Sequence, residues 1–198
     1  MFSNKTPSTP ARSTRTVDPK HEAFAIWITG LPASGKSTIT SALKKQLTAR
    51  GWDVAVLESD VLRKAFGGDR QYESQGRDGF YGQMVFVGSL LIEHGVSVIF
   101  DATANRRAYR DRARREIARF IEVYVDVLLE VCMARDPKGI YRSATAGQAA
   151  NVPGLQDPYE PPTTPDVVVH GENPEADARQ IIEKLQEKGY LATSLRHV

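Results

Sequence analysis

The stretch Gly30-Leu-Pro-Ala-Ser-Gly-Lys-Ser-Thr38 (GLPASGKST) directly follows the apolar run AFAIWIT, residues 23–29. It matches the pattern G-x-x-x-x-G-K-[ST], with the defining residues at Gly30, Gly35, Lys36 and Ser37. A continuous apolar run is typical of a strand buried on both faces of a sheet. Residues 36–50 carry the spacing of an amphipathic helix. The sequence therefore predicts a glycine-rich loop between a buried strand and a helix, which is the setting in which this pattern binds phosphate.

The residue types of the loop suit a triphosphate. Glycines let the backbone curl so that several N–H groups point at phosphate oxygens, and the helix start adds the positive end of its dipole. Lys36 neutralises the β- and γ-phosphates, and the Ser37 hydroxyl is a ligand for Mg²⁺. The chain has no N-K-x-D motif for guanine, so ATP is favoured over GTP. The alternative is a chance glycine-rich turn. The predicted ATP-binding residues are Gly30, Leu31, Pro32, Ala33, Ser34, Gly35, Lys36, Ser37 and Thr38.

Strand-like and helix-like patterns alternate along the rest of the chain. Further apolar runs typical of strands occupy residues 53–60, 96–103, 120–127 and 165–170. The last helix has Asn173 as a cap, Pro174 at its first position and Gly189 after its end. This alternation predicts an α/β fold of three layers, in which helices flank a parallel sheet, as in P-loop nucleoside triphosphate hydrolases and kinases.

The domain boundaries follow from composition. Residues 1–22 are rich in Ser, Thr and Pro, which predicts a disordered tail, and residues 23–198 form the predicted domain that carries the phosphate loop. Residues 138–165 are rich in Gly, Ala and Pro and have no long periodic pattern. A segment of this length between two core elements is expected to be a lid.

Charged residues gather where the predicted strands end. Ligands of parallel sheets bind beyond the carboxyl ends of the strands. The loop, Asp60, Asp101 and the segment after Val127 lie at such ends and are expected to share one crevice. Asp60 either approaches Mg²⁺ or takes a proton from an acceptor hydroxyl, and the alternative is a helix cap. Asp101 has the same two functional readings and the alternative of a cap or turn residue. Arg63 lies one helical turn beyond Asp60 and is expected to face the same ligand.

The helix over residues 106–119 carries seven arginines. A run of charge usually forms a solvated helix face, and we expect this of most of them. Arginines at its start are candidates for a clamp on an anionic substrate.

Composition narrows the partners and the compartment. The chain has 198 residues, and 26 basic against 24 acidic residues give a net charge of +2. This balance gives no reason to expect a nucleic acid or membrane partner. No apolar run reaches the roughly 18 residues that span a bilayer, and the N-terminus has no signal-peptide core. The single cysteine, Cys132, suits a reducing compartment, so we expect a cytoplasmic protein.

Several stretches together resemble the adenylylsulfate kinases, a family of P-loop kinases. They are ITGLPASGKST, ESDVLRK, YRDRAR, EVYVDVLLEVCMARDPKGIYR and DPYEPP, and the resemblance runs from Phe24 to Leu191. The phosphate loop is shared with many families, whereas VCMARDPKGIYR and PYEPP are more specific. The resemblance implies transfer of the γ-phosphate of ATP to the 3′-hydroxyl of adenylyl sulfate, with Mg²⁺, in sulfate assimilation by a homodimer.

The resemblance also implies roles for matching residues. The D-x-x-R pair matches Asp60, near the reacting hydroxyl and the metal, and Arg63, on the substrate. Arg77 and Lys138 match substrate-binding positions. Arg135 matches an arginine near the nucleotide or the lid hinge. The predicted catalytic residues are thus Lys36, Asp60 and Asp101, and the predicted metal ligands are Ser37 and Asp60.

Departures from the family pattern lie on the acceptor side. Phe80 stands where the family has asparagine, Gly82 and Gln83 replace two basic residues, and Val152 replaces a lid phenylalanine that stacks on adenine. Asp101–Arg107 (DATANRR) replaces the usual S-x-I-S-P segment and resembles other P-loop kinases. Phe80 is a candidate to supply the missing stack. The alternatives are therefore a kinase acting on another small hydroxyl compound or nucleotide, and a nucleotide-binding regulatory domain with little turnover.

Overall fold

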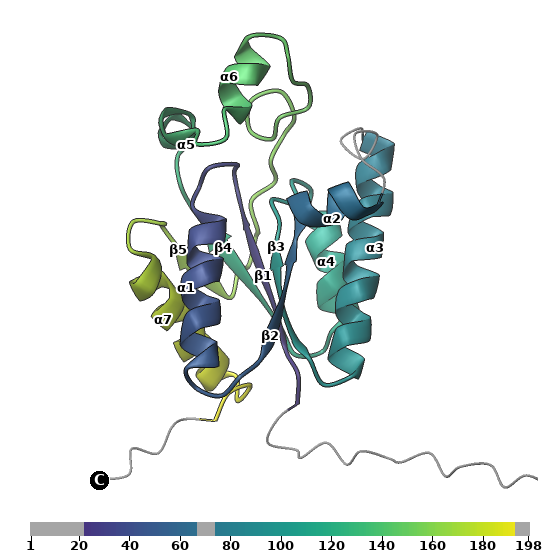
Figure 1. The fold of residues 1–198 in the computed structure, drawn as a ribbon, viewed down its shortest axis with the longest axis vertical. Helices are drawn as coiled ribbons and strands as arrows, with labels where there is room; N and C mark the ends of the chain where they lie inside the picture. The colour runs from purple at the N-terminus through teal and green to yellow at the C-terminus, as the bar shows by residue number, and fades with distance from the viewer. Residues whose placement is uncertain (1–21, 67–73, 193–198) are drawn as a thin grey trace, which may run out of the picture.

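A computed structural model describes residues 22–66 and 74–192 of the chain. Five parallel strands form one sheet in the order β2-β3-β1-β4-β5 (Figure 1). The strands are β1 (Ala25–Gly30), β2 (Val54–Glu58), β3 (Ser97–Asp101), β4 (Phe120–Val125) and β5 (Val167–Val169). The helices are α1 (Lys36–Thr48), α2 (Ser59–Phe66), α3 (Ser74–Glu93), α4 (Arg107–Glu116), α5 (Leu129–Arg135), α6 (Ile140–Thr145) and α7 (Pro174–Glu187). The predicted fold is confirmed.

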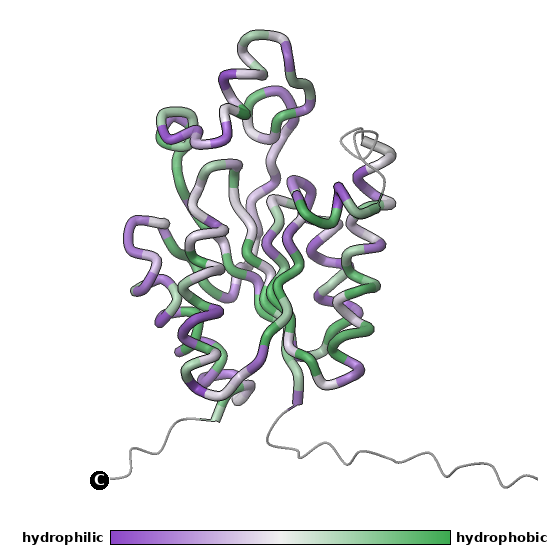
Figure 2. The backbone as a smooth tube through the Cα atoms, viewed as in Figure 1, coloured by the Kyte–Doolittle hydropathy of each residue, from purple (hydrophilic) through white to green (hydrophobic). Residues whose placement is uncertain are grey.

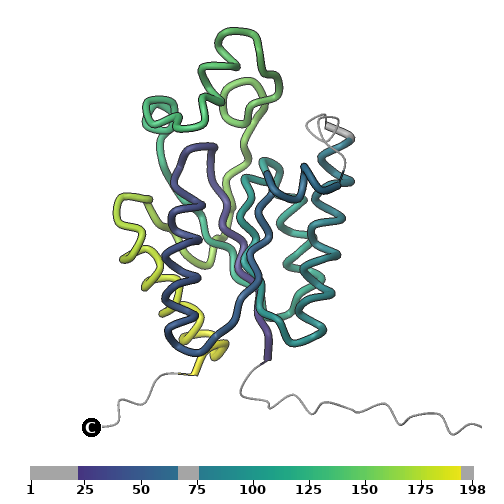
Figure 3. The backbone as a smooth tube through the Cα atoms, viewed as in Figure 1, coloured from purple at the N-terminus to yellow at the C-terminus, as the bar shows by residue number. Residues whose placement is uncertain are grey.

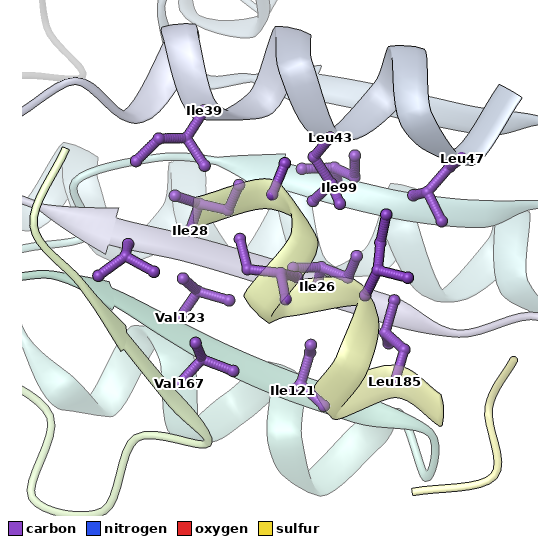
Figure 4. Packing of buried hydrophobic residues seen from close by; sticks show 14 of the residues in the cluster. Ile26, Ile28, Ile39, Leu43, Leu47, Ile99, Ile121, Val123, Val167 and Leu185 are labelled. Atoms are coloured by element: carbon purple, nitrogen blue, oxygen red, sulfur yellow. The ribbon is translucent and has the colours of Figure 1, made fainter. Parts of the chain in front are cut away.

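Two apolar cores separate the three layers because side chains of β1 alternate between the faces of the sheet. Ile26 and Ile28 face α1 and α7, where they meet Leu43 and Leu185 (Figure 4). Trp27 faces the other way, toward the core beneath α3 and α4 that contains Phe80, Tyr81, Met84 and Tyr109. Figure 2 shows hydrophobic residues along the strands and along much of α3. All six residues of β1 are buried, as expected for a central strand.

The segment between β4 and β5 rises above the carboxyl edge of the sheet as a lid (Figures 1 and 3). It contains α5, α6 and a return limb that comes back down to β5. Cys132, Tyr141, Ala144 and Val152 are buried together in a small core of its own. Although residues 138–165 have no long periodic pattern, they contain regular structure, because Ile140–Thr145 form α6 and a bridge joins Pro153 to Asp157.

Element boundaries differ from the predictions by a few residues. The second strand ends at Glu58, two residues before Asp60, and α2 begins at Ser59. Asn173 caps α7 as predicted, since its side chain accepts a hydrogen bond from the amide of Ala176 at 3.1 Å. The predicted tail, residues 1–22, lies outside the described residues except for Glu22. Within the described ranges, no helix combines the length and the apolar character that a bilayer crossing requires.

Candidate active site

The phosphate loop lies where the sequence predicts it, between the end of β1 and the start of α1. Gly35 caps α1 with a φ of 104°, a left-handed conformation that favours glycine. The loop is supported from the far end of the chain. A Cβ atom on Gly171, after β5, would lie 2.6 Å from the Ser34 carbonyl oxygen. The backbone at Gly171 is therefore too close to the loop to leave room for a side chain. The loop geometry thus depends on residues distant in sequence.

Lys36 is buried at the first position of α1, and its ammonium donates to the carbonyl oxygens of Gly30 at 3.2 Å and Leu31 at 2.8 Å. Burial lowers the pKa of Lys36 to about 8, and the nearby charge of Asp101 opposes this shift. The Lys36 ammonium is desolvated and bound to carbonyl oxygens of the loop, so it can exchange these partners for phosphate oxygens.

Asp101, the last residue of β3, is buried with 5% of its surface exposed. It is aligned with Ile28 of β1, next to the loop, and with Glu58 of β2. One carboxylate oxygen, Oδ2, is buried without a hydrogen-bond partner among the described residues. A buried carboxylate oxygen costs free energy unless something binds it. A cation or a hydroxyl group beside the loop would satisfy this atom.

Asp60 sits in the first turn of α2, and its Oδ2 lies 2.6 Å from Nζ of Lys138 at the base of the lid. The prediction that Asp60 ends the second strand is therefore wrong by two residues, although it still lies at the carboxyl edge of the sheet. The hydrogen bond to Asp60 raises the pKa of Lys138. Both side chains are more than half exposed, so this ion pair is weak and readily rearranged.

Arg63 is buried on the same helix, with its guanidinium carbon 3.9 Å from the centre of the Phe80 ring. This is a cation–π contact. Phe80 is only 1% exposed and belongs to the core beneath α3 and α4. It was predicted to stack on a substrate, but here it supports Arg63. The role of Phe80 as a substrate-stacking residue stays a prediction.

Arg77 is 5% exposed near the start of α3 and contacts the lid. It pairs with Asp157 and also donates to the Asn151 carbonyl oxygen. Arg63, Arg77 and Lys138 thus come from α2, α3 and the segment between α5 and α6, and their shared role in binding an anionic substrate stays a prediction.

The lid reaches the phosphate loop as well. The Tyr141 hydroxyl of α6 donates to the Pro32 carbonyl oxygen at 3.1 Å, and Arg135 of α5 contacts the Ser34 carbonyl oxygen at 3.4 Å. Leu31 and Ala33 pack against the lid core. The segment between β4 and β5 therefore contacts the phosphate loop through both α5 and α6, and its role in excluding water stays a prediction.

The comparisons with known proteins agree with this geometry. A family model described as adenylylsulphate kinase matches residues 22–170. The adenylyl-sulfate kinase of Microcystis aeruginosa is 38% identical over 174 residues, which is 87% of this chain and 96% of that protein. A probable adenylyl-sulfate kinase of Pseudomonas aeruginosa is 39% identical over 167 residues, covering 83% of this chain and 78% of that protein. The chain belongs to the adenylylsulphate kinase family.

Solved structures place this family member among kinases. The Mycobacterium tuberculosis APS kinase, solved in complex with AMPPNP and APS, has a TM-score of 0.78 and 30% identity, covering 83% of this chain and 98% of that one. A hexameric APS kinase from Thiobacillus denitrificans has a TM-score of 0.66 and 25% identity, covering 88% of this chain and 31% of that one. The family resemblance and the kinase class predicted from the sequence are confirmed.

The residues at which this chain departs from the family pattern lie in different parts of the structure. Val152 is buried in the lid core, and Gly82 lies against Arg112 of α4, while Gln83 is exposed. The Asp101–Arg107 segment instead contacts the return limb of the lid. The Asn105 amide donates to the Asp157 carboxylate and to the Pro158 carbonyl oxygen, both at 3.0 Å.

The arginine-rich helix of this adenylylsulphate kinase family member is not a simple solvated face. Arg110 is 1% exposed, and its Nε lies 2.6 Å from the Glu122 carboxylate in β4. Arg114 also contacts Glu122 at 3.4 Å. The expectation of solvation is wrong for Arg110, and the sequence signal for it was Glu122, a carboxylate inside a buried strand that needs a cation. Arg110 and Arg114 therefore join α4 to β4 through Glu122, and a clamp on an anionic substrate by the arginines at the start of the helix stays a prediction.

Proposed function

We propose that this protein transfers the γ-phosphate of ATP to the 3′-hydroxyl of adenylyl sulfate. The observation that carries the proposal is that Lys36 lies close to the Asp60–Lys138 pair and to Asp101, whose buried Oδ2 has no hydrogen-bond partner among the described residues. Phosphoryl transfer needs a cation on the donor phosphates and a carboxylate near the acceptor hydroxyl. The M. tuberculosis relative, solved with AMPPNP and APS, supports this donor and acceptor.

On the donor side, residues 30–38 bind the triphosphate and Lys36 neutralises its terminal phosphates. A bound Mg²⁺ would offset the negative charge of the phosphates. The Ser37 hydroxyl and the Asp60 and Asp101 carboxylates are the oxygen groups suited to hold it, and the free Asp101 oxygen favours a cation there. Arg135 steadies the loop through Ser34.

On the acceptor side, Asp60 orients or deprotonates the reacting hydroxyl, while Arg63, Arg77 and Lys138 hold the acceptor's anionic group. Acceptor binding releases Lys138 from Asp60, because the carboxylate must turn to the hydroxyl. The exposure of both side chains makes this exchange easy. The homodimer implied by the family and the cytoplasmic location expected from the single cysteine stay predictions.

The test measures ADP release with ATP and Mg²⁺, with and without adenylyl sulfate. We expect adenylyl sulfate to stimulate release, and Lys36→Ala to reduce the stimulated rate by at least about a hundredfold. The matched control is Lys44→Ala, an exposed lysine of the same helix, which should keep the wild-type rate. ATP binding without stimulation by adenylyl sulfate would exclude this acceptor.

A second candidate is a kinase of the same fold that acts on another small hydroxyl compound or nucleotide. Val152 is aliphatic and 5% exposed inside the lid core, and the Phe80 ring lies under Arg63, so neither residue offers an open aromatic face to an adenine. A panel of sugars, polyols and nucleosides scored by ADP release would favour this candidate if one of them outperforms adenylyl sulfate.

A further inference from the structure

Arg77 is a buried cation whose partners shown here both belong to the lid. Its guanidinium pairs with the Asp157 carboxylate and donates to the Asn151 carbonyl oxygen, and only 5% of the residue is exposed. A buried guanidinium needs an anion, because an unpaired charge is strongly unfavourable in such a place. The lid therefore supplies internally the negative charge that an acceptor would bring.

Asp157 is itself held in position from the β3–α4 segment. The Asn105 side-chain amide donates to its Oδ2 at 3.0 Å and to the Pro158 carbonyl oxygen at 3.0 Å. The backbone adds a third contact, from the Glu160 amide to the Asn105 carbonyl oxygen at 2.7 Å. Figure 3 shows this return limb descending from the lid to the sheet. Asn105 lies within the Asp101–Arg107 segment, which departs from the family pattern. The contacts of Asn105 with the return limb are therefore a feature of this chain and are not implied by the family pattern.

We propose that Asp157 is a specificity-determining residue, whose carboxylate occupies Arg77 until the anionic group of the acceptor replaces it. This inference rests on the proposed function, in which Arg77 holds that group. Exchange of one anion for another keeps the buried guanidinium neutralised throughout. The Asp157 side chain is 24% exposed, so it has a path to water when it is displaced.

The exchange discriminates between acceptor classes. An anionic hydroxyl compound replaces the charge that Asp157 withdraws. A neutral alcohol cannot, so the carboxylate stays on Arg77 and the site remains filled. Specificity of this kind comes from a built-in competitor rather than from added contacts with the substrate. The site therefore selects hydroxyl acceptors that carry a phosphate or sulfate group.

The test compares Asp157→Asn with Glu160→Gln, a matched carboxylate-to-amide change three residues further along the same limb that does not touch Arg77. The measured quantities are the KM for adenylyl sulfate, the KM for ATP and kcat. Asp157→Asn removes the competing carboxylate and should lower the KM for adenylyl sulfate roughly fivefold. The reason is that the apparent affinity of a ligand is its intrinsic affinity multiplied by the fraction of protein whose site is open. The KM for ATP should not change, and Glu160→Gln should match the wild type. A raised KM in Asp157→Asn would mean that Asp157 merely positions Arg77, which would overturn the proposal.

A double-mutant cycle separates the exchange from a structural effect. In an Arg77→Met background, Asp157→Asn should no longer alter the affinity for adenylyl sulfate, because there is no guanidinium left to occupy. A persistent effect of the same size would refute the exchange. If Asp157→Asn fails to fold, Asp157→Ser replaces it, since serine also removes the negative charge while keeping a polar group.

The failure of the proposed function is distinguishable from the failure of the exchange. If wild-type ADP release does not respond to adenylyl sulfate, the acceptor assignment fails, and inorganic sulfate becomes the probe. With ADP filling the phosphate loop, calorimetry should show Asp157→Asn binding sulfate several-fold more tightly than Glu160→Gln. Equal affinities would overturn the exchange whatever the acceptor is.

Discussion

At the scale of the residue, Lys36 shows how burial prepares a side chain for its ligand. The ordinary pKa of lysine, 10.5, falls to about 8 because the ammonium is desolvated at the start of α1. The unfolded chain therefore binds more protons than the folded one between these values, and stability contributed by Lys36 rises with pH across that window. Bound phosphates oppose the lowering of the Lys36 pKa, because their negative charge stabilises the protonated ammonium.

The affinity for ATP should consequently fall as pH rises past the pKa of the free protein. Because Lys36 stays protonated in the complex, the dissociation constant for ATP should be roughly tenfold larger at pH 9 than at pH 7.5, and ATP binding at high pH should take up a proton. Calorimetry in buffers of different ionisation enthalpy measures both quantities. An affinity that stays constant from pH 7.5 to 9 would show that Lys36 is charged before ATP arrives.

At the scale of the element, α4 is fixed to the sheet by a buried ion pair. Arg110 bonds Glu122 of β4 and donates to the carbonyl oxygens of Ala104 and, at 2.7 Å, Glu160. A single side chain thus joins α4, a central strand, the β3–α4 segment and the lid limb. Loss of one partner leaves a buried charge uncompensated, and the cost of this exceeds the value of the pair itself.

Glu122→Gln should therefore lower the free energy of unfolding by about 3 kcal/mol, because the amide keeps the shape of the carboxylate but leaves Arg110 unpaired. Urea denaturation measures the change. Glu160→Gln is the comparison, because its ion pair with Arg107 is long, at 3.9 Å, and its side chain is 41% exposed. The Glu160 variant should lose less than about 1 kcal/mol. Equal losses in the two variants would contradict a structural role for the buried pair.

Local signals made some elements predictable and left others out of reach. The β1–loop–α1 unit and the Asn173 cap follow from short-range rules of strand burial, glycine conformation and helix capping. The pairing of Arg77 with Asp157 joins residues 80 positions apart and has no local signature. Helix α6 was missed because its six residues are too few for a periodic pattern.

At the scale of the whole molecule, the phosphate loop is shaped by segments from three parts of the chain. Tyr141 and Arg135 hold the Pro32 and Ser34 carbonyls from the lid, and Gly171 supports the loop from beyond β5. Figure 1 shows the lid above the carboxyl edge of the sheet, and the order of strands brings β1, β4 and β5 side by side. Nucleotide binding is therefore sensitive to residues far from the motif that defines it.

Gly171→Ala tests this dependence, and Gly189→Ala is its matched control. Both glycines have left-handed backbones, with φ of 67° and 68°, so alanine costs each about 1 kcal/mol of stability. Only at Gly171 would the new methyl meet the Ser34 carbonyl oxygen, at 2.6 Å, whereas nothing lies within 4 Å at Gly189. The Gly171 variant should displace the loop and weaken ATP binding by at least about tenfold, as a lost loop contact does, while Gly189→Ala binds ATP normally. Calorimetric titration of both variants with ATP and Mg²⁺ decides, and equal affinities would mean that the loop holds its shape without support from the end of the sheet.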